Sequence, residues 1–218
     1  MLGFTPVSGA LLLTSVACGL VYGLGYLRAP ESALRSVFKT GAIGALSILA
    51  YVDGAPWLLI AALALSALGD LAISRDGETA FTLGLGAFLL AHIAYVPLFI
   101  EVGGSLSGWR IAAAVAVLIY AAVVARRLWP HLGPMRVPVA LYVIAILAMG
   151  VSALTAPFSL WPILLGAALF IASDTALAAE TFVFKDRTRP WTAPFIWSTY
   201  YLGQALIASA WICGHFGA

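Results

Sequence analysis

Residues 80–100 read AFTLGLGAFLLAHIAYVPLFI, a run without a single Asp, Glu, Lys or Arg. An α-helix of about 20 apolar residues is long enough to cross the hydrocarbon core of a bilayer. Similar runs repeat along the chain, and they lack the short apolar–polar alternation of membrane β-strands. The sequence therefore predicts an all-α membrane protein, a polytopic bundle of eight transmembrane helices at residues 8–27, 34–52, 55–74, 80–100, 108–127, 136–154, 160–180 and 191–213.

The composition of the chain excludes several classes of protein. Of the 218 residues, 63% are hydrophobic and only 9% are charged, whereas a soluble domain carries about 25% charged residues. A soluble enzyme, a disordered chain and a nucleic-acid-binding protein are therefore not expected. The connections between the apolar runs are short, which predicts one transmembrane domain over residues 1–218.

Basic residues gather in alternate loops. The loops after the first, third, fifth and seventh runs, with the adjoining helix ends, hold ten of them, and the opposite loops hold only Arg110. The positive-inside rule places the basic loops in the cytoplasm and both termini outside. Tryptophans at six predicted helix ends support these boundaries as an interfacial belt: Trp57, Trp109, Trp129, Trp161, Trp191 and Trp211.

Two carboxyl groups fall inside the predicted spans. Asp70 and Asp174 lie near the ends of the third and seventh spans, each beside a small residue. At 1.5 Å per residue, both are roughly 6–9 Å below the cytoplasmic boundary, and Lys39 lies at a similar depth in the second span. Because a carboxylate in hydrocarbon is costly, the acids are either functional or form a structural polar contact with Lys39; Lys39 alone can also snorkel to the interface.

Other polar side chains follow helical spacing. His92 and Tyr95 share one stripe of the fourth span, and Tyr200 and Gln204 share a face of the last, next to Tyr201. These residues are consistent with a binding site or with hydrogen bonds between helices. Glu180 is expected to be solvated, and no metal site is expected, because the cysteines and histidines lack ligand spacing.

Four segments of the chain together resemble the YhhN family of membrane proteins, which includes the lysoplasmalogenases. They are Gly69-Asp70, residues 83–95 (LGLGAFLLAHIAY), Ser173-Asp174 and residues 200–208 (YYLGQALIA). Their order and spacing, rather than any one of them, carry the resemblance, which extends over nearly the whole chain.

The resemblance implies hydrolysis of the vinyl ether bond of a lysoplasmalogen, a lysophospholipid drawn from the bilayer, to a fatty aldehyde and a glycerophospho-ethanolamine or -choline. The family's two membrane acids map onto Asp70 and Asp174, and no metal or cofactor is implied. The composition is typical of a bacterial protein, which predicts a multi-pass protein of the cytoplasmic (inner) membrane. The candidate substrate-binding residues are Lys39, His92, Tyr95, Tyr200, Tyr201 and Gln204.

A pair of carboxyl groups suits this chemistry. Protonation of the β-carbon of a vinyl ether creates an oxocarbenium ion, which water traps as a hemiacetal that collapses to aldehyde and alcohol. One protonated acid can donate the proton, and one carboxylate can stabilise the cation, as in glycosidases. We expect Asp174 to be the acid, although the roles can be reversed, and Arg75, Arg187 and Lys39 to hold the phosphate.

Two other functions remain open at this point. Intramembrane acids beside a lysine also serve as proton relays, so an ion-coupled transporter of a small molecule or lipid is the chief alternative. A non-catalytic lipid-binding protein is the other. Headgroup and chain-length preference, the physiological substrate and the oligomeric state do not follow from the sequence.

Overall fold

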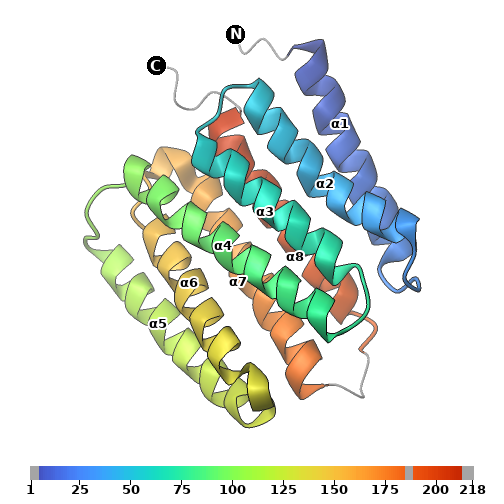
Figure 1. Ribbon diagram of the computed structural model, residues 1–218. Coiled ribbons are helices and arrows are strands. Elements are labelled where there is room, and N and C mark those ends of the chain that lie inside the picture. Colours follow the sequence, from blue (N-terminus) through green and yellow to red (C-terminus); the bar gives the residue numbers. More distant parts are fainter. Residues whose placement is uncertain (1–4, 185–188, 213–218) are drawn as a thin grey trace.

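The computed structural model describes residues 5–184 and 189–212 and folds them into eight α-helices without a strand (Figure 1). Each predicted span coincides with one helix within a few residues, so the predicted fold class is confirmed. The helices are α1 (Pro6–Val21), α2 (Ala33–Val52), α3 (Trp57–Ile73), α4 (Glu78–Val102), α5 (Trp109–Leu128), α6 (Arg136–Ala153), α7 (Trp161–Ala178) and α8 (Thr192–Ile212).

Two helices continue into a wider π-helical turn. Residues Tyr22–Tyr26 extend α1, and residues Ala179–Val183 extend α7. Short 3₁₀ turns occupy Trp129–His131, Gly133–Met135 and Phe158–Leu160 in the connections. Because α7 with its π turn reaches Val183, Asp174 is farther from the end of its helix than the sequence predicted.

Most of the helices have the length and composition of membrane spans. Within the described residues, six helical segments are long and apolar enough to cross a bilayer, and Trp57–Ile73 is a shorter apolar helix. Large apolar side chains face outward; Leu24, for example, is 88% exposed. Such a surface is stable in lipid and not in water. The protein is therefore a multi-pass membrane protein.

Local sequence determines where the first two helices begin. The Thr5 hydroxyl accepts a hydrogen bond from the Ser8 N–H (3.1 Å), and Pro6 occupies the first helical position of α1. Ser32 caps α2 in the same way through the Arg35 N–H (3.2 Å). These side chains satisfy N–H groups that have no partner within the helix.

The eight helices form a bundle with α1 at one edge and α5 at the other (Figure 1). The strongest packing joins α7 to α8, α3 to α4, α2 to α3, α1 to α2 and α4 to α6. Glycines allow close crossings, since a Cβ added at Gly166 would lie 2.7 Å from the Gly203 carbonyl oxygen. Small residues at such crossings bring helix backbones together.

The packing relates the two halves of the bundle. Helix α4 packs on α6 as α8 packs on α2, and the pairs α3–α4 and α7–α8 both pack closely. Changing each helix number by four, upward in the first half and downward in the second, converts α4–α6 into α8–α2 and α3–α4 into α7–α8. This is the pattern expected of two parallel four-helix units, in which α3 with Asp70 corresponds to α7 with Asp174.

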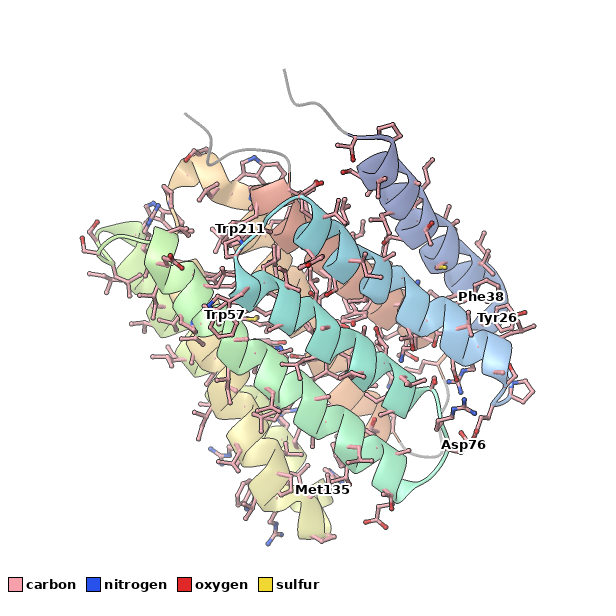
Figure 2. The ribbon with its side chains drawn as sticks, turned by 45° about the horizontal axis from the view of Figure 1, so that its top comes forward. Tyr26, Phe38, Trp57, Asp76, Met135 and Trp211 are labelled. Atoms are coloured by element: carbon pink, nitrogen blue, oxygen red, sulfur yellow. The ribbon has the colours of Figure 1, made fainter. Side chains whose placement is uncertain are left out.

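The helix directions place the basic loops together. Helices α1, α3, α5 and α7 all begin at the end of the bundle where α8 finishes (Figure 1). Trp57 and Trp211 lie toward that end, whereas Tyr26 and Asp76 lie at the opposite one (Figure 2). The loops that follow α1, α3 and α5, together with the described part of the α7–α8 connection, therefore share one end, which we call the basic end.

Candidate active site

A cavity of about 410 Å³ lies near the basic end, between the ends of α1, α2, α3, α7 and α8. Both Asp70 and Asp174 line this cavity, although they come from different halves of the chain. The Arg28, Arg35, Lys39 and Glu180 side chains also line it, and Trp197 and Tyr200 contribute part of its wall. The helix crossings thus bring together the two acids that the sequence singled out.

Asp70 is paired with a lysine and a tyrosine. Its side chain is 1% exposed, and Oδ1 lies 3.5 Å from Lys39 Nζ. The Tyr200 hydroxyl donates a hydrogen bond to Oδ2 (2.7 Å). Lys39 comes from α2 and Tyr200 from α8, so three helices meet at this carboxyl group. Lys39 was expected either to contact the acids or to extend to the membrane interface, and the structure shows its ion pair with Asp70.

Asp174 has a corresponding pair of partners from the other half. The Tyr142 hydroxyl, on α6, donates a hydrogen bond to Oδ2 (2.5 Å). His92 Nε2, on α4, lies 3.6 Å from the same oxygen. The partners of Asp70 come from α2 and α8, and those of Asp174 come from α6 and α4. The two acids are therefore related by the same shift of four helices as the packing of the fold.

The orientation of His92 constrains the proton content of its pair with Asp174. His92 Nδ1 lies 2.6 Å from the Phe88 carbonyl oxygen, which can only accept, so Nδ1 carries a hydrogen. In a neutral ring, Nε2 then presents a lone pair toward Asp174. An ionised Asp174 would oppose this lone pair, whereas a proton on either Asp174 or Nε2 removes the conflict. At 3.6 Å the two atoms are not hydrogen-bonded, so the geometry favours one proton on either of the two groups rather than a proton shared between them.

Three further predicted binding residues form a network away from the cavity wall. The Tyr95 hydroxyl donates to Gln204 Oε1 (2.5 Å), and Gln204 Nε2 donates to Ser66 Oγ (2.9 Å). Tyr201 lies 3.0 Å from Ser15 Oγ on α1 and stacks on Trp197. None of Tyr95, Gln204 and Tyr201 belongs to the cavity lining. They connect α8 to α4, α3 and α1.

A second, apolar cavity adjoins the first. Its volume is about 90 Å³, and residues of α4, α5, α6 and α7 enclose it. Asp174 and Phe88 line both cavities, with Ile73 and Leu177 beside them. Asp174 therefore stands where a polar cavity that contains a second acid meets an apolar one.

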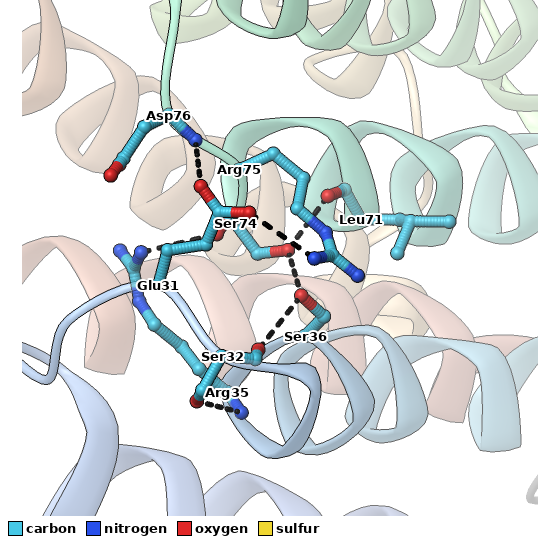
Figure 3. A network of polar contacts seen from close by, with 8 residues as sticks. All are labelled: Glu31, Ser32, Arg35, Ser36, Leu71, Ser74, Arg75 and Asp76. Atoms are coloured by element: carbon cyan, nitrogen blue, oxygen red, sulfur yellow. Dashed lines mark hydrogen bonds and ion pairs between the residues drawn. The ribbon is translucent and has the colours of Figure 1, made fainter.

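The cations near the site differ from those expected. Arg75 lies 3.2 Å from Glu31 and is not part of the cavity lining, and the Asp76 N–H donates to Glu31 (2.9 Å) (Figure 3). These donors, the Asp76 N–H first, hold the pKa of the Glu31 carboxyl below its usual value. Arg75 thus has a carboxylate partner outside the cavity, and its contact with a phosphate stays a prediction. Arg187 lies outside the described residues.

Several lining residues were not predicted, and one prediction was wrong. Glu180 is only partly exposed and accepts a hydrogen bond from the Thr192 hydroxyl (2.8 Å), so it is not simply solvated. Tyr142, Arg28 and Arg35 were missed as site residues. A lone tyrosine in an apolar span was the signal available for Tyr142, but nothing in the sequence says which face it occupies. Among the described residues, no group of three or more His, Cys, Asp or Glu has the arrangement of a metal site.

These features define an integral membrane protein, built only of helices in its described part, in which two carboxyl groups of separate helices share one cavity. The chain belongs to the YhhN family, whose sequence model matches residues 34–211. The resemblance stated from the four sequence segments is thereby confirmed.

Curated relatives share the same region. The chain is 35% identical over 162 residues to proteins named lysoplasmalogenase from Mycobacterium bovis and Mycobacterium tuberculosis, covering 72% of this chain and 60% of each relative. It is 34% identical over 152 residues to the rat (Rattus norvegicus) protein named lysoplasmalogenase TMEM86B, covering 69% and 60%. The chain thus spans about 60% of the length of these relatives. No solved structure matches the chain.

Proposed function

We propose that this protein hydrolyses the vinyl ether bond of a lysoplasmalogen, releasing a fatty aldehyde and a glycerophospho-ethanolamine or -choline. The observation that carries the proposal is that Asp70 and Asp174 line one cavity, with Asp174 also at the border of an apolar one. The names of the relatives support the same reaction. A lysolipid has a polar headgroup and an apolar chain, and the two cavities differ in the same way.

Asp174 is the general acid in this proposal. Its carboxyl proton is transferred to the β-carbon of the vinyl ether, and the electron pair of the double bond forms the new C–H bond. The oxocarbenium ion that results is positively charged, and Asp174 is left as a carboxylate. The Tyr142 hydroxyl donates to one of its oxygens and stabilises that anion, whereas His92 beside the same oxygen favours the protonated acid before the step.

Asp70 is the stabilising carboxylate. Lys39 and the Tyr200 hydroxyl favour its ionised form, because Lys39 places a positive charge beside it and the hydroxyl donates a hydrogen bond to it. Water adds to the oxocarbenium carbon and loses a proton. That proton passes to Asp174, so both acids return to their starting states. The hemiacetal then breaks its bond to the glycerol oxygen, which takes up the hydroxyl proton and leaves as an alcohol.

The position of the site suits a lipid substrate. The ether oxygen of a lysolipid lies just below its headgroup, and the cavity with both acids lies near the basic end of the bundle. By the positive-inside rule this end faces the cytoplasm, so the substrate would enter from the inner leaflet of a bacterial cytoplasmic membrane. Only the few chain carbons nearest the vinyl ether would fit in the apolar cavity beside Phe88.

Isosteric replacement of each acid tests the proposal. We expect Asp174→Asn and Asp70→Asn each to lower aldehyde release by at least about a hundredfold, because acid–base steps contribute about 10²–10⁴. Asp76→Asn is the matched control, since Asp76 is exposed and its side chain is outside the cavity. The assay is aldehyde release from lysoplasmenylethanolamine by purified, folded protein.

Full activity in either variant would remove that acid from the mechanism. The alternative function, an ion-coupled transporter, would instead require proton-dependent uptake into vesicles that both variants abolish, with no aldehyde formed by the unmodified protein.

A further inference from the structure

Three charged side chains of the cavity wall have no part in the proposed chemistry. Arg28, Arg35 and Glu180 line the polar cavity near the basic end. Lys39 is already paired with Asp70. The cavity wall therefore carries two guanidinium groups and one carboxylate that the proposed reaction does not use.

Arg35 is held in place but incompletely bonded. Its Nη1 donates to the Ser74 carbonyl oxygen at the end of α3 (3.1 Å), and Ser74 in turn contacts Ser36 (2.7 Å) (Figure 3). Arg35 Nε is buried and has no hydrogen-bond partner among the described residues. A buried donor without a partner is costly, and here it belongs to a side chain that lines a cavity. Because Nε is itself covered, an anionic group in the cavity would bind the part of the Arg35 guanidinium that lines the cavity rather than Nε.

Glu180 and Arg28 are joined through one backbone oxygen. Arg28 Nη2 donates to the Arg189 carbonyl oxygen (3.0 Å), and the Thr192 hydroxyl lies 2.9 Å from the same oxygen. That hydroxyl also lies 2.8 Å from Glu180 Oε1. Arg28 and Glu180, of opposite charge, are thus neighbours on one rim of the cavity. Glu180 sits in the π-helical turn after α7, and such turns recur at functional sites.

We propose that this rim, together with Arg35, reads the headgroup of the lysolipid as a zwitterion. Arg35, through the part of its guanidinium that lines the cavity, and Arg28 bind the phosphodiester, and Glu180 binds the ammonium group of an amino-alcohol. The proposal rests on the function proposed above, because it assigns the headgroup of that substrate. It makes Glu180 the residue that distinguishes an amino-alcohol headgroup from an uncharged one.

Uncleavable lipids test this assignment without turnover. Binding to purified protein is compared for three lipids with a saturated 1-O-alkyl chain. They are 1-O-alkyl-glycerophosphoethanolamine, 1-O-alkyl-glycerophosphomethanol and 1-O-alkylglycerol. The first two differ by the ammonium group, and the last two by the phosphodiester. We expect the unmodified protein to bind the ethanolamine lipid about tenfold more tightly than the methanol lipid, in line with one ionic contact.

Two conservative variants separate the contacts. Glu180→Gln keeps an oxygen for Thr192 and should abolish the preference for the ethanolamine lipid while leaving the methanol lipid unchanged. Arg35→Lys keeps a positive charge but removes the planar guanidinium, and should weaken both phosphodiester lipids about tenfold without affecting the alkylglycerol. Glu101→Gln, at the opposite end of the bundle, is the control that should change none of them.

Several outcomes would overturn the headgroup site. These are an unaltered preference in Glu180→Gln, equal loss of all three lipids in Arg35→Lys, and no binding by the unmodified protein. Competition by chainless glycerophosphoethanolamine as strong as that of the lipid would reject a lipid as the occupant. If the predicted binding pattern appears but the protein releases no aldehyde from a vinyl ether lysolipid, the proposed hydrolysis fails and the headgroup site stands.

Discussion

At the scale of single residues, each cavity acid is held by one tyrosine hydroxyl and one basic side chain, but the two basic side chains differ. Lys39 carries a charge and is 3.5 Å from Asp70. His92 presents Nε2 to Asp174 while Nδ1 is committed to the Phe88 carbonyl. The first environment favours a carboxylate, and the second favours a proton on either the acid or the imidazole. Two identical side chains are thereby given different roles by their neighbours.

The ion pair of Asp70 makes a prediction about stability. Lys39→Met leaves a buried carboxylate without its cation, which should lower the free energy of unfolding by about 3 kcal/mol. Adding Asp70→Asn to this variant should restore most of that loss, because the amide is neutral and its oxygen can still accept from Tyr200. Thermal unfolding in detergent measures both effects.

Arg127→Met is the matched control for this pair, because Arg127 is exposed on α5. Its effect should stay within about 0.5 kcal/mol. A double variant of Lys39 and Asp70 that is no more stable than Lys39→Met would show that the ion pair does not matter for the fold.

The residues of the site were predictable only in part. Asp70, Asp174 and Lys39 stand out because a charge inside an apolar span is rare and costly. Tyr142 and Glu180 do not, since tyrosines are common in membrane helices and a glutamate near a helix end is usually solvated. Arg35 and Arg75 looked alike in the sequence. Only the helix packing shows that one lines the cavity and the other pairs with Glu31.

At the scale of helices, the crossing of α7 and α8 positions Tyr200 against Asp70. A Cβ at Gly203 would lie 2.8 Å from the Gly166 carbonyl oxygen and 3.2 Å from the Phe170 backbone nitrogen. The backbones can approach this closely only because both crossing residues are glycines. The spans themselves followed from hydropathy, whereas this pairing of helices did not, because hydropathy does not identify the partner of a helix.

This crossing gives a second stability prediction. Gly203→Ala should destabilise the protein by roughly 1–3 kcal/mol, because α8 must move away from α7, and should lower activity by displacing Tyr200. Gly86→Ala is the control, because Gly86 also lies in the middle of a helix, α4, but a Cβ added there would have no atom within 4 Å. It should be neutral or slightly stabilising. Equal melting temperatures for the two variants would contradict the close crossing.

At the scale of the whole molecule, alternation of the helices gathers the basic loops and the candidate site at one end. The charge distribution predicts which side of the membrane this end faces. The positive-inside rule predicts the cytoplasm. The catalytic cavity would then draw its substrate from the inner leaflet.

Cysteine labelling tests this orientation. In a background with Cys18 and Cys213 replaced by serine, Gly104→Cys and Arg127→Cys place exposed thiols at opposite ends of the bundle. A membrane-impermeant maleimide applied to intact cells should label position 104 and leave position 127 unlabelled until the membrane is opened. Labelling of position 127 alone in intact cells would reverse the orientation.

The central claim, that the acid pair protonates a vinyl ether carbon, is tested most directly by hydrolysis in D₂O. Purified protein is given lysoplasmenylethanolamine, the aldehyde is reduced at once to an alcohol, and its deuterium content is measured by mass spectrometry. The mechanism predicts one deuterium on the carbon next to the former carbonyl, with the product lost in Asp174→Asn and Asp70→Asn and retained in Asp76→Asn. Absence of the aldehyde with the unmodified protein, or its undiminished release by both acid variants, would contradict the account.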